Sequence, residues 1–366
     1  MEAVNILYSE DDSEITEAIV ASLSRQIFDG DPPKPAPSYK RMLGFISFHL
    51  LKRTTSTKTE TGHDGQEFIA YQNSILERSK HPYAQALLET SGADSAMLVE
   101  GGDPMNAPYM MISPEIKRST CIWDRLLLDS VQGKDVQIRF TCEAQATLEA
   151  AKRRLEEGRA VRLKAAAAGT GLSMILVFDR LIREEYDPAL ITMTITDRCA
   201  TNIIKINRLI GKLASTRQHL AQPGKPSGIS AHTEDLMEPG PGTDEPYQIV
   251  TLIGILEYFH GFTSTTTEEH LGHLSPGDKP CGEELAHTIA AMTSEHGTLI
   301  ANTYRVEVGA RILEIFGKKF RYRDRKDLHA LVEIAGFVPS HTAGSGHIYD
   351  VEVFKKRAES QGEFGN

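Results

Sequence analysis

The residues with the clearest chemical pattern in this chain form a turn of small residues and a later acid. The turn, residues 165–171, reads A-A-A-A-G-T-G between an apolar strand pattern and a helix pattern. Glycines there let the backbone approach a ligand closely, and a helix start offers free N–H groups to an anion. Asp197 ends the next apolar run, where an acid can accept hydrogen bonds from a ribose diol. The pattern predicts a site for a nucleoside-bearing ligand, with cofactor contacts from Ala167, Gly169, Gly171 and Asp197.

The length of the glycine turn indicates which nucleoside ligand to expect. It is not a full G-x-G-x-x-G fingerprint, because Met174 stands where the third glycine would fall. A nicotinamide enzyme is expected to use the fuller fingerprint and a seat for a pyrophosphate. A shorter turn suits a ligand with one carboxylate and no pyrophosphate, and S-adenosylmethionine is such a ligand. The structural alternative is a tight turn that binds nothing.

The elements that must position these residues alternate after about Phe140. Apolar runs predict strands at 161–168, 191–196, 229–232, 247–253, 298–302 and 348–354. Helical spacing predicts helices at 141–157, 172–185, 200–214, 283–295 and 326–334. Such alternation implies an α/β fold, with a Rossmann-like, doubly wound and mostly parallel sheet between helices on both faces.

The first third of the chain shows helix patterns and no run of alternating strands. Helices are predicted at 11–28, 39–52, 67–79, 83–91 and 119–131. We therefore divide the chain into a helical N-terminal module, 1–135, and a sheet domain, 136–366. We expect the module to cover the carboxyl edge of the sheet and shape the substrate pocket as a lid, or to form a homodimer contact.

Composition excludes several classes of protein. The 366 residues are 40% hydrophobic and 25% charged, as in ordinary soluble domains, and the net charge of −10 disfavours nucleic acid as the main partner. The four cysteines are widely spaced, without a C-x-x-C pair. The first fifteen residues lack a signal-peptide pattern, and no apolar run is long enough to span a bilayer. We expect a cytoplasmic protein without a membrane partner.

The region from about 140 to 356 resembles the class I S-adenosylmethionine-dependent methyltransferases of the bacterial small-molecule type. Four pieces stand in order: the glycine motif at 161–173, the ribose acid in 195–197, the fourth-strand motif at 247–259 and the fifth strand at 297–302. The segment V-T-L-I-G-I-L-E-Y-F resembles a G-L-F-D-Y-L motif, and 322–337 resembles a Y-R-x-x-x-x-L…A-G-F tail. The resemblance makes 348–354 a late antiparallel strand.

The resemblance also implies further cofactor contacts and shows one departure. It implies that an acid after the third strand, Asp235 beside Glu234, meets the adenine amino group, and that Ile255 packs on the adenosine. The family's glycine motif begins with an acid, whereas Lys164 or Ala165 stands near that place here. The methionyl amino group therefore lacks its usual partner nearby.

The catalytic candidates follow the fourth strand, at the edge of the sheet where ligands bind. Methyl transfer requires an aligned acceptor, exclusion of water and, in many cases, removal of a proton. Glu257 is suited to bind an amine or guanidinium or to act as base, Tyr258 to orient the acceptor, and His260 to act as general base. We expect no metal, although His270 and His273 have a spacing that permits one helical face.

These expectations define a favoured function and two alternatives. The favoured one is methyl transfer from S-adenosylmethionine to a small polar metabolite, with Glu257 favouring N-methylation of an amino or guanidino compound. Arg305 or Arg323 would grip a substrate carboxylate, unless each forms a structural ion pair. The first alternative keeps the fold but uses the cofactor structurally in a non-methylating enzyme. The second is a nicotinamide-dependent oxidoreductase.

Overall fold

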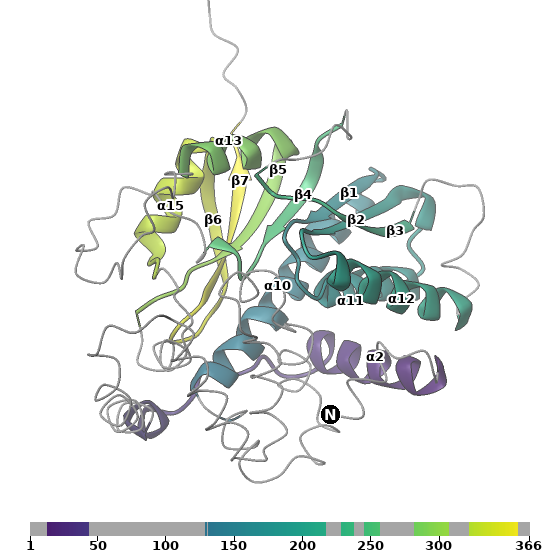
Figure 1. The fold of residues 1–366 in the computed structure, drawn as a ribbon, viewed down its shortest axis with the longest axis horizontal. Coiled ribbons are helices and arrows are strands. Elements are labelled where there is room, and N and C mark those ends of the chain that lie inside the picture. Colours follow the sequence, from purple (N-terminus) through teal and green to yellow (C-terminus); the bar gives the residue numbers. More distant parts are fainter. Residues whose placement is uncertain are drawn as a thin grey trace, which may run out of the picture.

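A seven-stranded sheet forms the centre of the part of the chain that the computed structural model describes, residues 13–43, 129, 131–216, 228–237, 245–256, 282–306 and 322–357. The strand order is β3-β2-β1-β4-β5-β7-β6 (Figure 1). Strands β1 to β5 are parallel, and β7 is antiparallel to both β5 and β6. The strands are β1 (Val161–Ala165), β2 (Ile191–Asp197), β3 (Gly228–Thr233), β4 (Tyr247–Leu252), β5 (Thr293–Asn302), β6 (Phe337–Ser345) and β7 (Asp350–Lys356).

Helices cover both faces of this sheet and make two separate apolar layers. Figure 1 shows α10, α11 and α12 on one side and α13 and α15 on the other. Each layer has its own cluster of buried apolar side chains, one containing Leu163 and Ile195 and the other Val250 and Leu299. The helices are α2 (Ser13–Phe28), α10 (Val131–Glu156), α11 (Leu172–Arg183), α12 (Ala200–Thr216), α13 (Gly282–Met292) and α15 (Arg325–Ile334), with a 3-10 turn at Pro188–Leu190. The predicted doubly wound, mostly parallel sheet with a late antiparallel strand is confirmed.

Strand β6 and helix α10 differ most from the sequence prediction. Strand β6 was not predicted, because its burial pattern is that of an exposed edge strand and it contains Pro339 and Gly344. Helix α10 begins at Val131, about ten residues earlier than its helical pattern suggests. The alternation of Val136, Ile138 and Phe140, together with the nearby Gly133, is typical of a strand, and tertiary packing overrides it.

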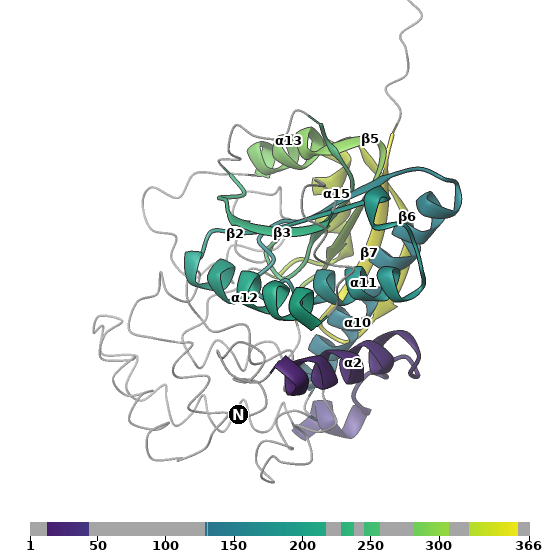
Figure 2. The ribbon, with the colours of Figure 1, turned by 90° about the vertical axis from the view of Figure 1, so that its right-hand side faces the viewer.

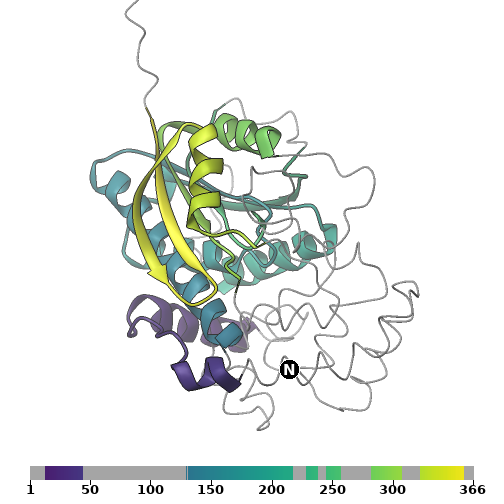
Figure 3. The ribbon, with the colours of Figure 1, turned by 90° about the vertical axis from the view of Figure 1, so that its left-hand side faces the viewer.

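The β6–β7 hairpin is held against the first turns of α10. The fully buried carboxylate of Asp135 accepts hydrogen bonds from the backbone N–H groups of Ile348 and Tyr349. Desolvation raises the pKa of Asp135, and these backbone hydrogen bonds oppose the rise. Figure 3 shows the hairpin turn reaching down to α10, close to the N-terminal segment. There His347 hydrogen-bonds the backbone oxygen of Ala36 through Nε2 at 2.8 Å.

The one long described helix of the N-terminal region, α2, belongs to the same core as the sheet. Helix α2 lies next to α10, α11 and α12 (Figure 2). Its Val20, Leu23 and Ile27 are buried in the apolar layer that these helices form. The helices predicted at 67–79 and 83–91, and nearly all of that at 119–131, lie outside the described residues, so the division at 135/136 and the role of the module stay predictions. Among the described helices, none combines the length and apolarity needed to cross a membrane.

Candidate functional site

The glycine turn after β1 is built from left-handed backbone. Ala167, Gly169 and Gly171 have φ values of 52°, 56° and 60°. Ala168 donates its N–H to the backbone oxygen of Thr196, and Gly171 donates to that of Ala168. The turn therefore folds back on itself and lies against the end of β2. This arrangement places the small residues of 166–171 at the carboxyl edge of the sheet, where ligands bind in open α/β folds.

Packing as well as backbone conformation requires a glycine at position 171. It stands at the N-cap of α11, and a Cβ built on it would lie 2.8 Å from Cγ2 of Ile195 in β2. Ser173, two residues later, does not cap the helix, because its hydroxyl donates to Glu143. Gly171 thus brings α11 close to β2 whatever the turn binds. Its contact with a cofactor, like those of Ala167 and Gly169, stays a prediction.

Ala167 has a left-handed backbone conformation that glycine adopts without steric strain. We expect Ala167→Gly to raise the free energy of unfolding by up to about 1 kcal/mol, because a left-handed L-residue costs about 1–2 kcal/mol and glycine loses about 0.5–1 kcal/mol more entropy on folding. Urea denaturation measures the change. Ala168→Gly is the matched control, since Ala168 lies outside the positive-φ set and should only lose stability. Equal losses in both variants would contradict the expectation.

Asp197 ties the end of β2 to the glycine turn. Its Oδ2 accepts a hydrogen bond from the backbone N–H of Gly169 at 2.8 Å, and its Oδ1 accepts from Cys199 N–H at 2.8 Å and from the Asn202 amide at 3.4 Å. Burial raises the pKa of this carboxyl, and the backbone hydrogen bonds act against that rise. A carboxylate has about four acceptor sites, and three are used here, so about one remains for a ribose hydroxyl. The predicted ribose contact is compatible with this geometry.

The acids after β3 have separate partners. Asp235, the predicted adenine contact, accepts a hydrogen bond from the backbone N–H of Met237 within its own exposed loop. Glu234 instead forms a buried ion pair with Lys164 of β1, with Nζ and Oε1 2.5 Å apart. Lys164 also lies 5.4 Å from the ring centre of Tyr247. The lysine in the glycine motif is therefore paired within the protein, and the adenine contact of Asp235 stays a prediction.

The end of β4 is described only in part. Ile255 is half-buried against the second apolar cluster, and Gly254 donates its N–H to the side-chain oxygen of Asn302 at 2.7 Å. The three catalytic candidates, Glu257, Tyr258 and His260, lie outside the described residues, as do His270 and His273. Within the described part of the chain, no group of three His, Cys, Asp or Glu side chains is placed to hold a metal.

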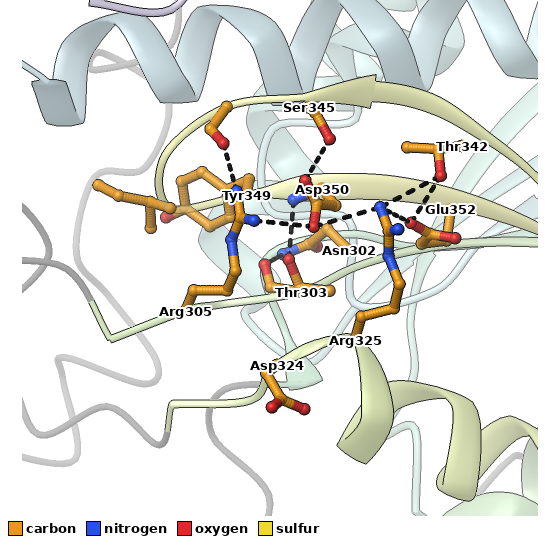
Figure 4. Close-up of polar contacts among 12 residues, drawn as sticks. Asn302, Thr303, Arg305, Asp324, Arg325, Thr342, Ser345, Tyr349, Asp350 and Glu352 are labelled. Carbon is orange, nitrogen blue, oxygen red and sulfur yellow. Dashed lines mark hydrogen bonds and ion pairs between the residues drawn. The ribbon is translucent and has the colours of Figure 1, made fainter. Parts of the chain in front are cut away.

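Two arginines, one after β5 and one at the start of α15, form ion pairs with buried acids. Figure 4 shows Arg305 and Arg325 converging on Asp350, at 3.2 Å and 3.5 Å. Arg325 also lies 2.9 Å from the buried Glu352. Arg323 donates from Nε to the backbone oxygen of Leu256. Of the arginine roles considered from sequence, the structural ion pair is the one whose geometry is present at Arg305.

One buried acid next to the turn was missed from sequence. Glu143 of α10 is 7% exposed and accepts a hydrogen bond from the Ser173 hydroxyl, at the start of α11. Burial raises its pKa to about 7, against the lowering effects of Ser173, Arg139 and Thr251. The available signal was an acid beside the apolar face of a predicted helix, but only the crossing of α10 under β1 and β4 places it near the turn.

Comparisons with known proteins give matches of structure alone. No protein-family model and no curated protein sequence matches the chain. Magnesium protoporphyrin IX methyltransferase from Synechocystis PCC 6803, with bound S-adenosylhomocysteine, is 15% identical over 60% of this chain and 87% of its own, with a TM-score of 0.36. The N-methyltransferase NodS from Bradyrhizobium japonicum WM9, in complex with the same compound, is 12% identical over 60% and 88%, also with a TM-score of 0.36.

A third matching structure spans nearly the whole chain. This possible exported protein from Bordetella parapertussis is 13% identical over 96% of this chain and 98% of its own, with a TM-score of 0.48. At such identities the likeness concerns the fold, and what the matching proteins bind or methylate is a property of those proteins. The chemistry of this chain must therefore be inferred from its own residues.

Proposed function

We propose that the protein is an S-adenosylmethionine-dependent methyltransferase that acts on a small polar metabolite. The observation on which this depends is the left-handed turn 167–171, hydrogen-bonded through Gly169 to the carboxylate of Asp197 at the carboxyl ends of β1 and β2. S-adenosylmethionine bound there would place its ribose at Asp197 and its amino-acid end along the turn. The short turn suits a ligand without a pyrophosphate.

The chemistry of such a site is alignment and exclusion of water. When bound, S-adenosylmethionine supplies a methyl group on a positively charged sulfur. The protein's task is to hold the acceptor in line with that methyl group and to receive any proton that the acceptor loses. We assign these tasks to Glu257, Tyr258 and His260, which follow β4 in the chain. Glu257 favours an amino or guanidino acceptor.

The protein is proposed to work in the cytoplasm, as a monomer or homodimer, without a nucleic-acid or membrane partner.

Ligand binding provides the first test. A ligand at 100 times its Kd that binds only the native state stabilises it by about 2.7 kcal/mol. We expect S-adenosylhomocysteine to raise the melting temperature and NADH to leave it unchanged. The reverse order would favour the nicotinamide-dependent alternative.

A substrate panel with labelled methyl donor tests the acceptor. We expect amines and guanidines to be methylated and S-adenosylhomocysteine to form in equal amount to product. Exclusive methylation of phenols or carboxylic acids would remove the preference for nitrogen.

Asp197 provides the second test. We expect Asp197→Ala to weaken S-adenosylhomocysteine at least tenfold, about 1.4 kcal/mol, because the sugar loses its acceptor and Gly169 loses its tether. Calorimetry well below the unfolding temperature measures the affinity. Asp187→Ala is the control, since Asp187 caps the 3-10 turn before β2, at the opposite edge of the sheet. Unchanged affinity in Asp197→Ala would contradict the proposed ligand pose.

A further inference from the structure

The place of the missing acid in the glycine motif is filled from another element. Ala165 ends β1 and is paired in register with Thr251 of β4. Register partners on neighbouring parallel strands direct their side chains to the same face of a sheet. The Thr251 side chain faces the carboxyl group of Glu143 on α10, and its hydroxyl lowers the pKa of that group. The carboxyl group of Glu143 therefore lies on the face of the sheet to which Ala165, at the start of the turn, directs its side chain.

The polar surroundings of Glu143 fit a carboxylate that receives a cation. Its Oε1 accepts a hydrogen bond from the Ser173 hydroxyl of α11 at 3.0 Å, and the Thr251 hydroxyl of β4 also lowers the pKa of the carboxyl group. The charged group that acts on it among the described residues is Arg139, one helical turn earlier on α10. The guanidinium of Arg139 lies 4.5 Å over the ring of Tyr349. Thus α11 and β4 both face Glu143 with neutral hydroxyl groups.

We propose that Glu143 binds the ammonium group at the amino-acid end of the cofactor, in place of the acid that the glycine motif lacks. This inference rests on the proposed function, because it concerns the same ligand. A buried carboxylate close to the turn can accept a charge-assisted hydrogen bond from an ammonium group. The turn residues 165–171 are alanine, glycine and threonine, and none of them has a carboxylate. The acid is therefore supplied by α10. Glu143 is thus a cofactor-binding residue.

Binding and protonation are then linked. Burial raises the pKa of Glu143 to about 7, so the free protein holds the neutral acid below that pH. An ammonium ligand binds the ionised form, and binding must therefore release a proton at lower pH. Affinity for a ligand with this ammonium group should rise more than about tenfold between pH 5.5 and pH 7 and level off only above about pH 8. A ligand without the ammonium group should show no such rise.

The test compares two probes on the full chain by calorimetry. S-adenosylhomocysteine has the amino-acid end, and 5′-methylthioadenosine lacks it. We expect Glu143→Gln to weaken S-adenosylhomocysteine about tenfold or more at pH 7, to abolish its rise with pH, and to leave 5′-methylthioadenosine unchanged. Glu149→Gln, at an exposed position of the same helix, is the control and should behave as wild type.

A second variant keeps the test decisive if Glu143→Gln does not fold. Ser173→Ala removes a hydrogen bond that lowers the pKa of Glu143, so the rise in affinity should move to higher pH. The inference is overturned if Glu143→Gln weakens both probes equally, or neither. If wild type binds 5′-methylthioadenosine or S-adenosylhomocysteine normally but without a pH-dependent difference, only the role of Glu143 fails. If wild type binds neither probe, the proposed function fails with it.

Discussion

Lys164→Met is expected to lower the free energy of unfolding by about 3–5 kcal/mol, because it leaves the carboxylate of Glu234 buried without its cation. The side chains of Lys164 and Glu234 are only 5% and 10% exposed, and the pair is 2.5 Å apart. The carboxylate is also 3.4 Å from the ring of His232, whose side chain is half exposed. Urea denaturation at neutral pH measures the loss.

Removal of both charges separates the cost of an orphaned ion from the worth of the pair. The double variant Lys164→Met/Glu234→Leu should recover most of the loss, since an apolar replacement of a buried pair is often neutral. Glu245→Ala is the matched surface control. Glu245 pairs with Arg162, which lies on the same strand as Lys164, but Glu245 is 80% exposed. The free energy of unfolding should therefore fall by less than about 1 kcal/mol in Glu245→Ala. A Lys164→Met variant no less stable than Glu245→Ala would refute the expectation.

Gly171→Ala is expected to lower the free energy of unfolding by about 2–5 kcal/mol. A left-handed φ of 60° costs an L-residue about 1–2 kcal/mol, and the new methyl group would meet Ile195 and Ile206 in a filled space, adding about 1–3 kcal/mol. The variant should also bind S-adenosylhomocysteine more weakly, because α11 and the turn must move away from β2. Denaturation and calorimetry measure the two effects.

A second glycine distinguishes conformation from packing at this position. Gly158 has a φ of 69° after α10, and a Cβ built there meets nothing within 4 Å. Gly158→Ala should therefore cost only the conformational part, about 1–2 kcal/mol. If Gly158→Ala and Gly171→Ala are equally destabilised, contact with Ile195 has no role in the choice of glycine at 171.

The strand and helix order after residue 140 could be predicted because its signals are local. The apolar run of β2 and the spacing of Ile203, Ile206 and Leu209 in α12 each need only one element for their interpretation. The late antiparallel strand was predicted from the resemblance to methyltransferases. Helix α13 was predicted to reach residue 295 but ends at Met292, where β5 begins directly at Thr293. No loop residues separate the two elements, so the sequence holds no boundary signal.

Contacts between elements that are distant in the chain could not be predicted from the sequence. The acid at 197 was expected at a sugar, and its hydrogen bond to Gly169 depends on how closely the turn folds back. Lys164 was considered only as a departure from the glycine motif, because Glu234 is seventy positions away. Glu143 was missed for the same reason: a helix pattern gives the face of a residue but not the strands beneath it. In each case the partner is set by topology.

The carboxylate of Asp135 has a practical consequence for anyone who shortens this protein. It lies on the second turn of α10, yet it holds the loop before β7 through two backbone N–H groups more than two hundred residues later. A fragment starting at residue 136 would expose that loop and unravel the beginning of α10, even though the glycine turn is intact. Expression trials should keep everything from α2 onward, or at least start ahead of Val131, so that lost solubility is not mistaken for lost catalysis.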